Sequence, residues 1–307
     1  MEAKKRVALM GTVIELQVAH PKADSLLQET VRRLEDYEHR FSANKKDSML
    51  GQVNQAAGKH PVQVDEDLFD LIALAKEVSL STHLAFNLAI GPLVQLWRIG
   101  FEDAHVPDPK DIQCQIQKVD PKAVLLREEE HQVYLKKEGM AIDLGAIAKG
   151  YFADQIIAFW KGQGAMYGLI NLGGNVRVMG DSPKSEDGSW QIGIQKPGQR
   201  RGELIGKVRV KDKSVVTSGI YERKLCVQGR TYHHIFDSKT GYPLTSDMTS
   251  LTVISGRSVN GENWTTALFH YSAKEAIFRL DKQEGLEGLA INQTGEIFFS
   301  KGLRGNE

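Results

Sequence analysis

Apolar residues recur at helical spacing in several parts of the chain. Between residues 22 and 40, Leu26, Leu27, Val31 and Leu34 fall on one helical face, which predicts an amphipathic helix. The same pattern predicts further helices over residues 66–82, 146–164 and 264–282, and shorter ones that begin near Asp47 and after Asp108-Pro109.

Other segments are rich in β-branched residues or alternate apolar and polar positions, and these predict strands. The expected elements are one strand over residues 7–19, a hairpin over 131–145, a strand with a glycine turn over 167–178, several strands over 204–256 and a hairpin around Gln293-Thr294-Gly295. Residues 179–203 and the end of the polar stretch 107–130 are expected to be loop and linker.

Helices and strands follow one another without a regular βαβ rhythm. This order favours an α+β fold over a doubly wound parallel sheet. No change of composition marks a domain boundary, so we expect one domain over residues 1–307, with room for a small subdomain around residues 60–130.

Composition narrows the class of protein. The 307 residues are 41% hydrophobic, and Lys+Arg and Asp+Glu are both 39, so bulk charge gives no reason to expect nucleic-acid binding. Cys114 and Cys226 are far apart and outside any CxxC pattern, which argues against a disulfide scaffold or a cysteine zinc site. No signal-peptide core or membrane-spanning stretch is evident, so a cytoplasmic protein without membrane insertion is expected. An exported lipoprotein is the alternative if a leader has been removed.

Two glycine-containing segments suggest phosphate chemistry. In residues 141–154, Asp143 precedes a glycine and can cap the following helix, whose backbone amides and Lys149 could hold a phosphate. A capped helix with a surface lysine explains the same spacing. The paired glycines Gly173-Gly174 permit either close backbone approach or a plain tight turn.

Two further segments carry candidate reactive groups. His233 and His234 would face opposite ways on a strand, so at most one is expected to enter a given site, and Asp237 follows closely. Glu262 and Thr266 are four residues apart and share one face of a helix, where their oxygens would suit Mg²⁺. A helix cap or a solvated helix start is the alternative for this pair.

Taken together, these segments resemble the ApbE family of FAD:protein FMN transferases. The matching blocks stand in one order: Met10-Gly11-Thr12, Phe41 to Asn54, residues 84–97, 143–154, 169–175, 217–223, 233–243 and 261–267. Three positions depart from the family pattern, because Asn87 and Glu262 stand where the family has Asp, and Ser238 stands where it has Pro. Glutamate is longer than aspartate by one methylene and can still bind Mg²⁺, with an expected change in metal affinity or preference.

The resemblance implies a single ApbE-like (T-fold-like) domain with mixed or antiparallel sheets and flanking helices. It also implies Mg²⁺-dependent transfer of FMN from FAD to a threonine of an acceptor flavoprotein, with release of AMP. His234 and Asp237 would lie near the reacting phosphate, and the Ala146 carbonyl, Glu262 and Thr266 would hold Mg²⁺. The residues implied in FAD binding are Met10, Asn44, Leu84, Ala85, Phe86, Asp143, Lys149 and Phe236.

Three alternatives remain open from the sequence. An FAD pyrophosphatase would use the same fold and metal, with water in place of threonine. A non-catalytic flavin carrier would bind FAD without releasing AMP. A dinucleotide oxidoreductase is disfavoured, because no GxGxxG follows a predicted strand.

Overall fold

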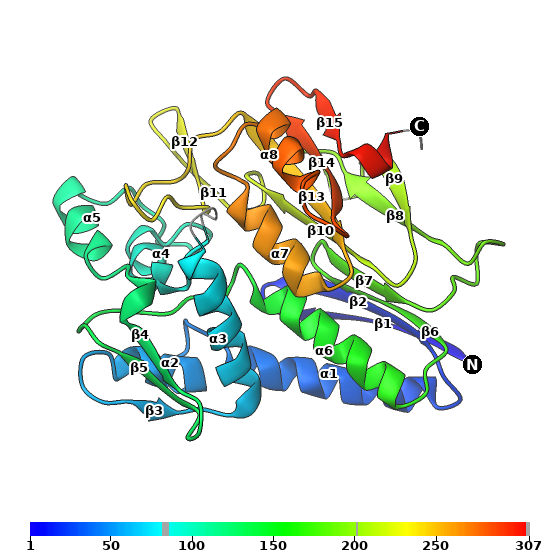
Figure 1. Ribbon diagram of the computed structural model, residues 1–307, viewed down its shortest axis with the longest axis horizontal. Helices are drawn as coiled ribbons and strands as arrows, with labels where there is room; N and C mark the ends of the chain where they lie inside the picture. The colour runs from blue at the N-terminus through cyan, green and yellow to red at the C-terminus, as the bar shows by residue number, and fades with distance from the viewer. Residues whose placement is uncertain (82–85, 201, 305–307) are drawn as a thin grey trace.

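A large antiparallel sheet organises the molecule. The computed structural model describes residues 1–81, 86–200 and 202–304. Within them, eight strands form one sheet in the order β1-β2-β6-β7-β10-β13-β14-β15 (Figure 1), which confirms the predicted α+β class. These strands are β1 (Glu2–Leu9), β2 (Thr12–Ala19), β6 (Tyr167–Leu172), β7 (Asn175–Met179), β10 (Ser214–Gly219), β13 (Met248–Ser255), β14 (Glu287–Asn292) and β15 (Ile297–Phe299).

Four helices cover one face of this sheet (Figure 1). Two helices, α1 and α6, pack on β2 and β6, where the indole N–H of Trp160 donates to the Thr30 hydroxyl over 2.8 Å. The other two, α7 and α8, pack on β13 and β14 around Leu251, Phe269 and Ile277. Their bounds are α1 (Ala23–Arg40), α6 (Ala148–Gly162), α7 (Ser258–Ala267) and α8 (Ala273–Leu280).

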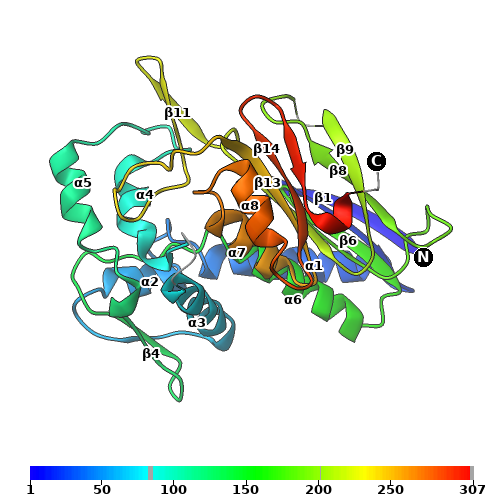
Figure 2. The ribbon, with the colours of Figure 1, turned by 45° about the horizontal axis from the view of Figure 1, so that its top comes forward.

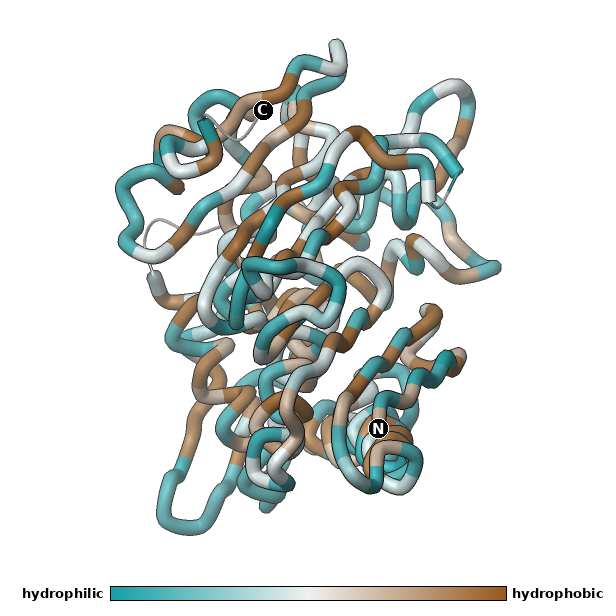
Figure 3. The backbone as a smooth tube through the Cα atoms, turned by 90° about the vertical axis from the view of Figure 1, so that its right-hand side faces the viewer, coloured by the Kyte–Doolittle hydropathy of each residue, from teal (hydrophilic) through white to brown (hydrophobic). Residues whose placement is uncertain are grey.

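A two-stranded ribbon, β8 (Trp190–Gln195) and β9 (Leu204–Val210), covers the opposite face of the sheet (Figure 2). Trp190 and Ile192 of the ribbon pack with Val215 of β10 and Leu289 of β14. Hydrophobic positions therefore gather between the layers, and hydrophilic positions gather on many of the outer loops (Figure 3).

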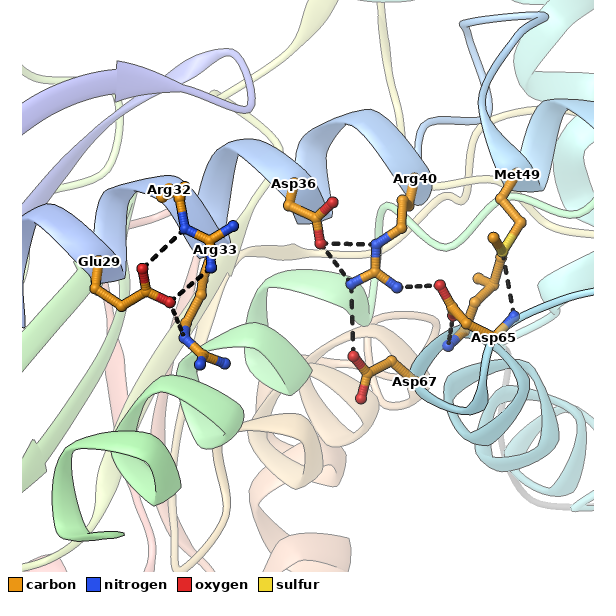
Figure 4. Close-up of polar contacts among 9 residues, drawn as sticks. Glu29, Arg32, Arg33, Asp36, Arg40, Met49, Asp65 and Asp67 are labelled. Carbon is orange, nitrogen blue, oxygen red and sulfur yellow. Dashed lines mark hydrogen bonds and ion pairs between the residues drawn. The ribbon is translucent and has the colours of Figure 1, made fainter. Parts of the chain in front are cut away.

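The remaining elements lie beside these layers, on the left of Figure 1. A small antiparallel sheet has the order β3-β5-β4, and β11 pairs with β12. Three hydrogen-bonded carboxylates at the end of α1 and the start of α3 surround Arg40 and tie this region to α1 (Figure 4). The elements are α2 (Met49–Gln55), β3 (Val62–Gln63), α3 (Glu66–Leu80), η1 (Leu88–Ile90), α4 (Gly91–Trp97), α5 (Pro109–Ile116), η2 (Pro121–Ala123), β4 (Val124–Arg127), β5 (Gln132–Leu135), β11 (Lys224–Val227) and β12 (Arg230–His233), with η3 (Lys301–Leu303) near the C-terminus.

The first predicted strand is a hairpin in the structure. The chain turns between β1 and β2, so a single strand over 7–19 was wrong. Met10 and Gly11 both have positive φ, 53° and 67°, and two such residues form the turn that suits the twist of a two-residue hairpin. This turn places Met10 at one end of the large sheet.

Two other predictions, of a hairpin and of a loop, placed strands wrongly. The segment 131–145 contributes only β5, which pairs with β4 inside the expected linker and with β3. The expected loop 179–203 contains β8, where buried and exposed residues alternate along the strand. In both cases the strand is short, and the charged residues beside it make its alternating pattern of buried and exposed positions hard to recognise in the sequence.

The predicted helix 264–282 is two helices. Its first part begins earlier, at Ser258, and ends at Ala267. The Ser272 hydroxyl then accepts a hydrogen bond from the Glu275 N–H and caps α8. A serine followed by a glutamate three residues later is a capping signal, so the break was visible in the sequence. The helices predicted over 22–40 and 66–82 and the two glycine-containing hairpins are confirmed.

None of the helices in the described part of the chain is long and apolar enough to cross a membrane.

Candidate active site

The site is built where α6 and α7 approach each other closely. Gly150, in the first turn of α6, faces α7, and a methyl group there would lie 2.7 Å from the Ser258 carbonyl oxygen and 2.8 Å from Cγ of Glu262. Contacts that short are excluded sterically, so this position requires glycine for the observed spacing. The close approach brings Lys149, one residue before Gly150, into electrostatic range of Glu262.

Glu262 is a buried carboxylate that a neighbouring amide holds in place. Its residue is only 5% exposed, and Oε1 accepts a hydrogen bond from Nδ2 of Asn175 over 2.8 Å. The Ser258 hydroxyl donates to Oδ1 of Asn175 over 2.6 Å, which fixes the amide orientation. Burial raises the pKa of Glu262, while Lys149 and the Asn175 amide act in the opposite direction.

Asp154 anchors the start of α7 on α6. Its two carboxylate oxygens accept hydrogen bonds from the backbone N–H groups of Ser258 and Val259, at 2.8 and 3.0 Å. A carboxylate at a helix N-terminus satisfies free amides and interacts favourably with the helix dipole. Arg177 lies 3.5 Å from the same carboxylate. Asp154 therefore sets the position of the helix that carries Glu262 and Thr266.

His234 lies within electrostatic range of two cations. Lys149 and Arg223 both act electrostatically on its ring, and Nδ1 lies 3.3 Å from the Arg223 carbonyl oxygen. Burial is the main cause that lowers the pKa of His234 to about 4, and the two cations lower it further. The ring is therefore neutral at pH 7. His233 has different ring contacts, since its ring centroid lies 6.3 Å from that of Phe269.

Asp143 caps a turn rather than the helix that follows. Its Oδ1 accepts from the Gly145 N–H over 2.8 Å, whereas α6 begins only at Ala148, without a side-chain cap. The prediction that Asp143 caps this helix was therefore wrong, because its carboxylate caps the turn that precedes the helix. Burial raises the pKa of the Asp143 carboxyl, and Arg223 opposes this effect from across the site.

The segment that carries Asp143 is clamped from both sides. The Asn54 side chain exchanges two hydrogen bonds with the backbone of Ile142, at 2.7 and 3.0 Å. The Asp143 N–H donates to the carbonyl oxygen of Leu88 over 2.9 Å. Asn87 accepts from the Ala89 N–H over 2.9 Å and so caps η1, which explains how this chain uses Asn at that position.

The Met10-Gly11 turn reaches the same end of the sheet. The Met10 N–H donates to Oε1 of Glu38 over 2.7 Å, which fixes the turn on α1. A methyl group at Gly11 would lie 3.8 Å from a guanidinium nitrogen of Arg223, so the turn faces that arginine.

Several predicted residues lie outside this cluster of charges. Asn44 is exposed, Phe86 is buried in the core with α1 and α6, and Phe236 is buried beside Trp97. The Asp237 carboxylate accepts from the Lys239 N–H over 2.8 Å and shapes the turn that follows. The predicted positions Leu84 and Ala85 fall outside the described residues.

Sequence reasoning missed Asn54, Asp154, Asn175 and Arg223 as individual site residues. All four stand inside the blocks that carried the resemblance, so the blocks contained the signal. Their roles depend on contacts between segments far apart in the chain, such as the 104 residues between Asp154 and Ser258. Local spacing carries no information on such contacts.

The chain matches known proteins over nearly its whole length. The family model of the ApbE family matches residues 10–290. The chain belongs to the ApbE family. A protein of Klebsiella pneumoniae (strain 342), named FAD:protein FMN transferase, is 40% identical over 96% of this chain and 91% of its own length. A protein of Treponema pallidum (strain Nichols) with the same name is 34% identical over 98% of this chain and 88% of its own.

Solved ApbE structures share the fold. The ApbE protein of Thermotoga maritima superposes with a TM-score of 0.89 at 27% identity, over 99% of this chain and 98% of that one. The flavin transferase ApbE from Vibrio cholerae gives a TM-score of 0.80 at 24% identity, over 98% and 97% of the two chains. The ApbE fold therefore extends over nearly the whole chain.

Proposed function

We propose that this chain transfers FMN from FAD to a threonine hydroxyl of an acceptor flavoprotein and releases AMP. The observation that carries the proposal is the convergence of Lys149, His234 and the buried Glu262 at the junction of α6, α7 and β12. Two cations beside a neutral histidine suit a doubly negative pyrophosphate. The relatives named FAD:protein FMN transferase support the same reaction.

The oxygen atoms of α7 fit Mg²⁺. Glu262 is a buried carboxylate without an ion pair among the described residues, and Thr266 lies one helical turn further along the same face. The neighbouring Asn263 has a buried Oδ1 without a hydrogen-bond partner in the described structure. The described residues include no cluster of three or more His, Cys, Asp or Glu side chains for a metal, so these oxygens, the Ala146 carbonyl and the substrate's own oxygens would complete the shell.

When bound, Mg²⁺ would withdraw charge from the pyrophosphate oxygens. Glu262 would hold the ion, and its orientation would be kept by the Asn175 amide. Lys149, which lies in electrostatic range of both Glu262 and His234, would neutralise charge on the phosphate. A glutamate at this position is longer than the family aspartate by one methylene, and Gly150 leaves room for its Cγ, since a methyl group there would lie 2.8 Å from that atom.

His234 would accept the proton of the attacking threonine. Its Nδ1 lies 3.3 Å from the Arg223 carbonyl oxygen, which can only accept, so Nδ1 carries the proton and Nε2 is free to take another. The threonine oxygen forms a bond to the phosphorus of the FMN half, and the bridging P–O bond breaks with its electron pair leaving on AMP. The negative pyrophosphate would raise the pKa of His234 from about 4 toward neutrality and strengthen it as a base.

The other predicted residues would surround the flavin nucleotide. Asp143 is a predicted FAD contact within electrostatic range of Arg223, and Met10 precedes Gly11, the turn residue that faces Arg223. Asn44, Phe86 and Phe236 would contact parts of FAD remote from the reacting phosphorus. Asp237 would act near the phosphate only if its turn rearranges on binding.

Intact-mass spectrometry of an acceptor domain tests the proposal. The protein is incubated with FAD, Mg²⁺ and an acceptor that carries a flavinylation threonine, and a mass gain of one FMN is expected. The gain should vanish without Mg²⁺ and in His234→Gln. Free FMN and AMP without a gain would instead identify a pyrophosphatase, and FAD binding without AMP release would identify a carrier.

A further inference from the structure

The aliphatic stem of Arg223 packs against Gly100, and this contact positions the side chain. It lies between β10 and β11, and a methyl group at Gly100 would lie 2.8 Å from its Cδ and 3.3 Å from its Cγ. Gly100 has φ of +94° and Gly11 has φ of +67°. The Arg223 side chain extends from Gly100, which lies beside its stem, to Gly11, which lies beside its guanidinium group. Two segments that lie about ninety residues apart thus leave space for one arginine side chain.

The charged end of Arg223 has no ion pair within 4 Å among the described residues, although it is exposed. Its field reaches the carboxylate of Asp143 and the ring of His234. Arg40 and Arg98 differ from it, because each bonds to a carboxylate. A planar guanidinium group that is positioned by packing and left unpaired is well suited to bind phosphate oxygens through two parallel hydrogen bonds.

Arg223 and Lys149 act on the same histidine, yet each has a different carboxylate within range. Lys149 is close to Glu262, on α7, and Arg223 is close to Asp143, which precedes α6. Both cations act electrostatically on the ring of His234. A dinucleotide pyrophosphate carries two linked negative phosphates and can meet both cations at once.

We propose that Arg223 binds a phosphate of the FAD pyrophosphate and positions it beside His234. The inference rests on the proposed function and adds a substrate-binding residue to it. Arg223 supplies hydrogen bonds and charge in addition to those of Lys149, and its stem is positioned by its packing against Gly100.

Arg223→Met is the decisive variant, because methionine keeps an aliphatic stem against Gly100 and removes the charge. Binding is measured by the change in flavin fluorescence as protein is added to FAD or to riboflavin, which lacks phosphate. We expect the dissociation constant for FAD to rise at least about tenfold and that for riboflavin to stay unchanged. Arg223→Lys should recover part of the affinity, since it restores the charge without the planar fork.

Arg230→Met is the matched control, because Arg230 is an exposed arginine at the start of β12, on the same hairpin. It should bind FAD as the unchanged protein does. An NMR titration adds a second readout, since loss of the Arg223 charge should raise the pKa of His234 above its value of about 4.

Equal FAD affinity in Arg223→Met and the unchanged protein would overturn the inference, and so would an equal loss for FAD and riboflavin, which would indicate a structural role. If Arg223→Met does not fold, Arg223→Gln decides by the same criterion. Failure of the unchanged protein to bind FAD would contradict the proposed function itself and is seen in the first titration.

Discussion

Two groups of charged side chains in this protein are arranged in opposite ways. In the first, along α1, each charge lies against an opposite charge (Figure 4). In the second, around His234, no ion pair joins the charged side chains to any described residue. The paired group consists of Glu29 with Arg32 and Arg33, and of Arg40 with Asp36, Asp65 and Asp67; the unpaired group consists of Asp143, Lys149, Arg223 and Glu262.

The pKa values of three carboxyl groups illustrate this division. A hydrogen bond from Arg32 is the main cause that lowers the pKa of Glu29, whereas burial raises the pKa of Glu262 and of Asp143. Paired charges stabilise the fold, although modestly at the surface. Unpaired, desolvated charges cost stability and gain their partners from a ligand. Charge pairing therefore distinguishes these two groups of side chains.

Replacing a glutamate by glutamine in each group gives the largest expected difference in FMN transfer. Glu262→Gln should lower FMN transfer by at least about a hundredfold, because it removes the charge that would hold Mg²⁺. Its melting temperature without Mg²⁺ should stay the same or rise at pH 7, because the cost of burying a carboxylate is removed. Intact-mass kinetics and calorimetry measure the two effects.

Glu29→Gln is the matched control in the paired group, and we expect transfer at the unchanged rate. Retained transfer in Glu262→Gln, with an unaltered response to Mg²⁺, would show that the metal is held elsewhere.

Asn175→Ala should have a smaller effect on the same site. It removes the amide that donates to Glu262 and leaves the carboxylate free to rotate. Loss of such a supporting contact commonly costs about tenfold in metal affinity. The Mg²⁺ concentration for half-maximal transfer should therefore rise by about that factor while the maximal rate changes less. A lowered maximal rate at unchanged Mg²⁺ dependence would assign Asn175 to another step.

The sequence predicted the chemistry of single segments better than the contacts between them. Glu262 and Thr266 are placed by helical spacing alone, and that prediction depends only on four residues of separation. Gly150 and Asp154 lie in the same predicted helix, yet their partners are on α7, about a hundred residues later. No local pattern relates these partners, because they meet only when the sheet has assembled.

Helices and strands were predicted correctly where the hydrophobic periodicity extends over many residues. The predictions failed where the periodic segment is short. The helix 22–40 has five turns of consistent pattern, whereas β8 has six residues among charged neighbours. Helix α7 has polar residues on several sides, because it is surrounded by α6, β10 and the site, so its true start at Ser258 lacked an amphipathic signal. The residues that build the site are thus the ones that weaken the pattern.

Arg40→Met should break the paired group without affecting the site. It leaves the carboxylates of Asp36, Asp65 and Asp67 close together without a cation. Because Arg40 is mostly buried and its partners are partly exposed, we expect a loss of about 2 kcal/mol in the free energy of unfolding. Urea denaturation measures this loss, and transfer per folded molecule should not change. Arg32→Met, at an exposed position of the same helix, is the control and should have no measurable effect.

The smallest effect expected is a dependence of stability on pH with two opposite signs. The folded pKa of His234 is lowered from 6.5 to about 4, so its contribution to stability is lost as pH falls through that window. The pKa of Glu262 is raised above 4.5, so its contribution is lost as pH rises above that value. Near pH 5 the two trends oppose each other, and the unchanged protein without Mg²⁺ should show a shallow profile.

Two variants separate these trends by a shift of a few degrees in melting temperature. Glu262→Gln removes the Glu262 part of the falling trend, to which Asp143 also contributes, so its melting temperature should rise more steeply from pH 4 to 6.5 than that of the unchanged protein. His234→Gln removes the His234 part of the rising trend, to which His233 also contributes, so its melting temperature should rise less steeply over that range than that of the unchanged protein. Mg²⁺ binds the ionised carboxylate, so the stabilisation it gives should grow with pH in His234→Gln and be absent in Glu262→Gln. Parallel profiles in all three proteins would mean that burial shifts neither the pKa of Glu262 nor that of His234. The contrast with the paired charges on α1 would then make no difference to the free energy of unfolding.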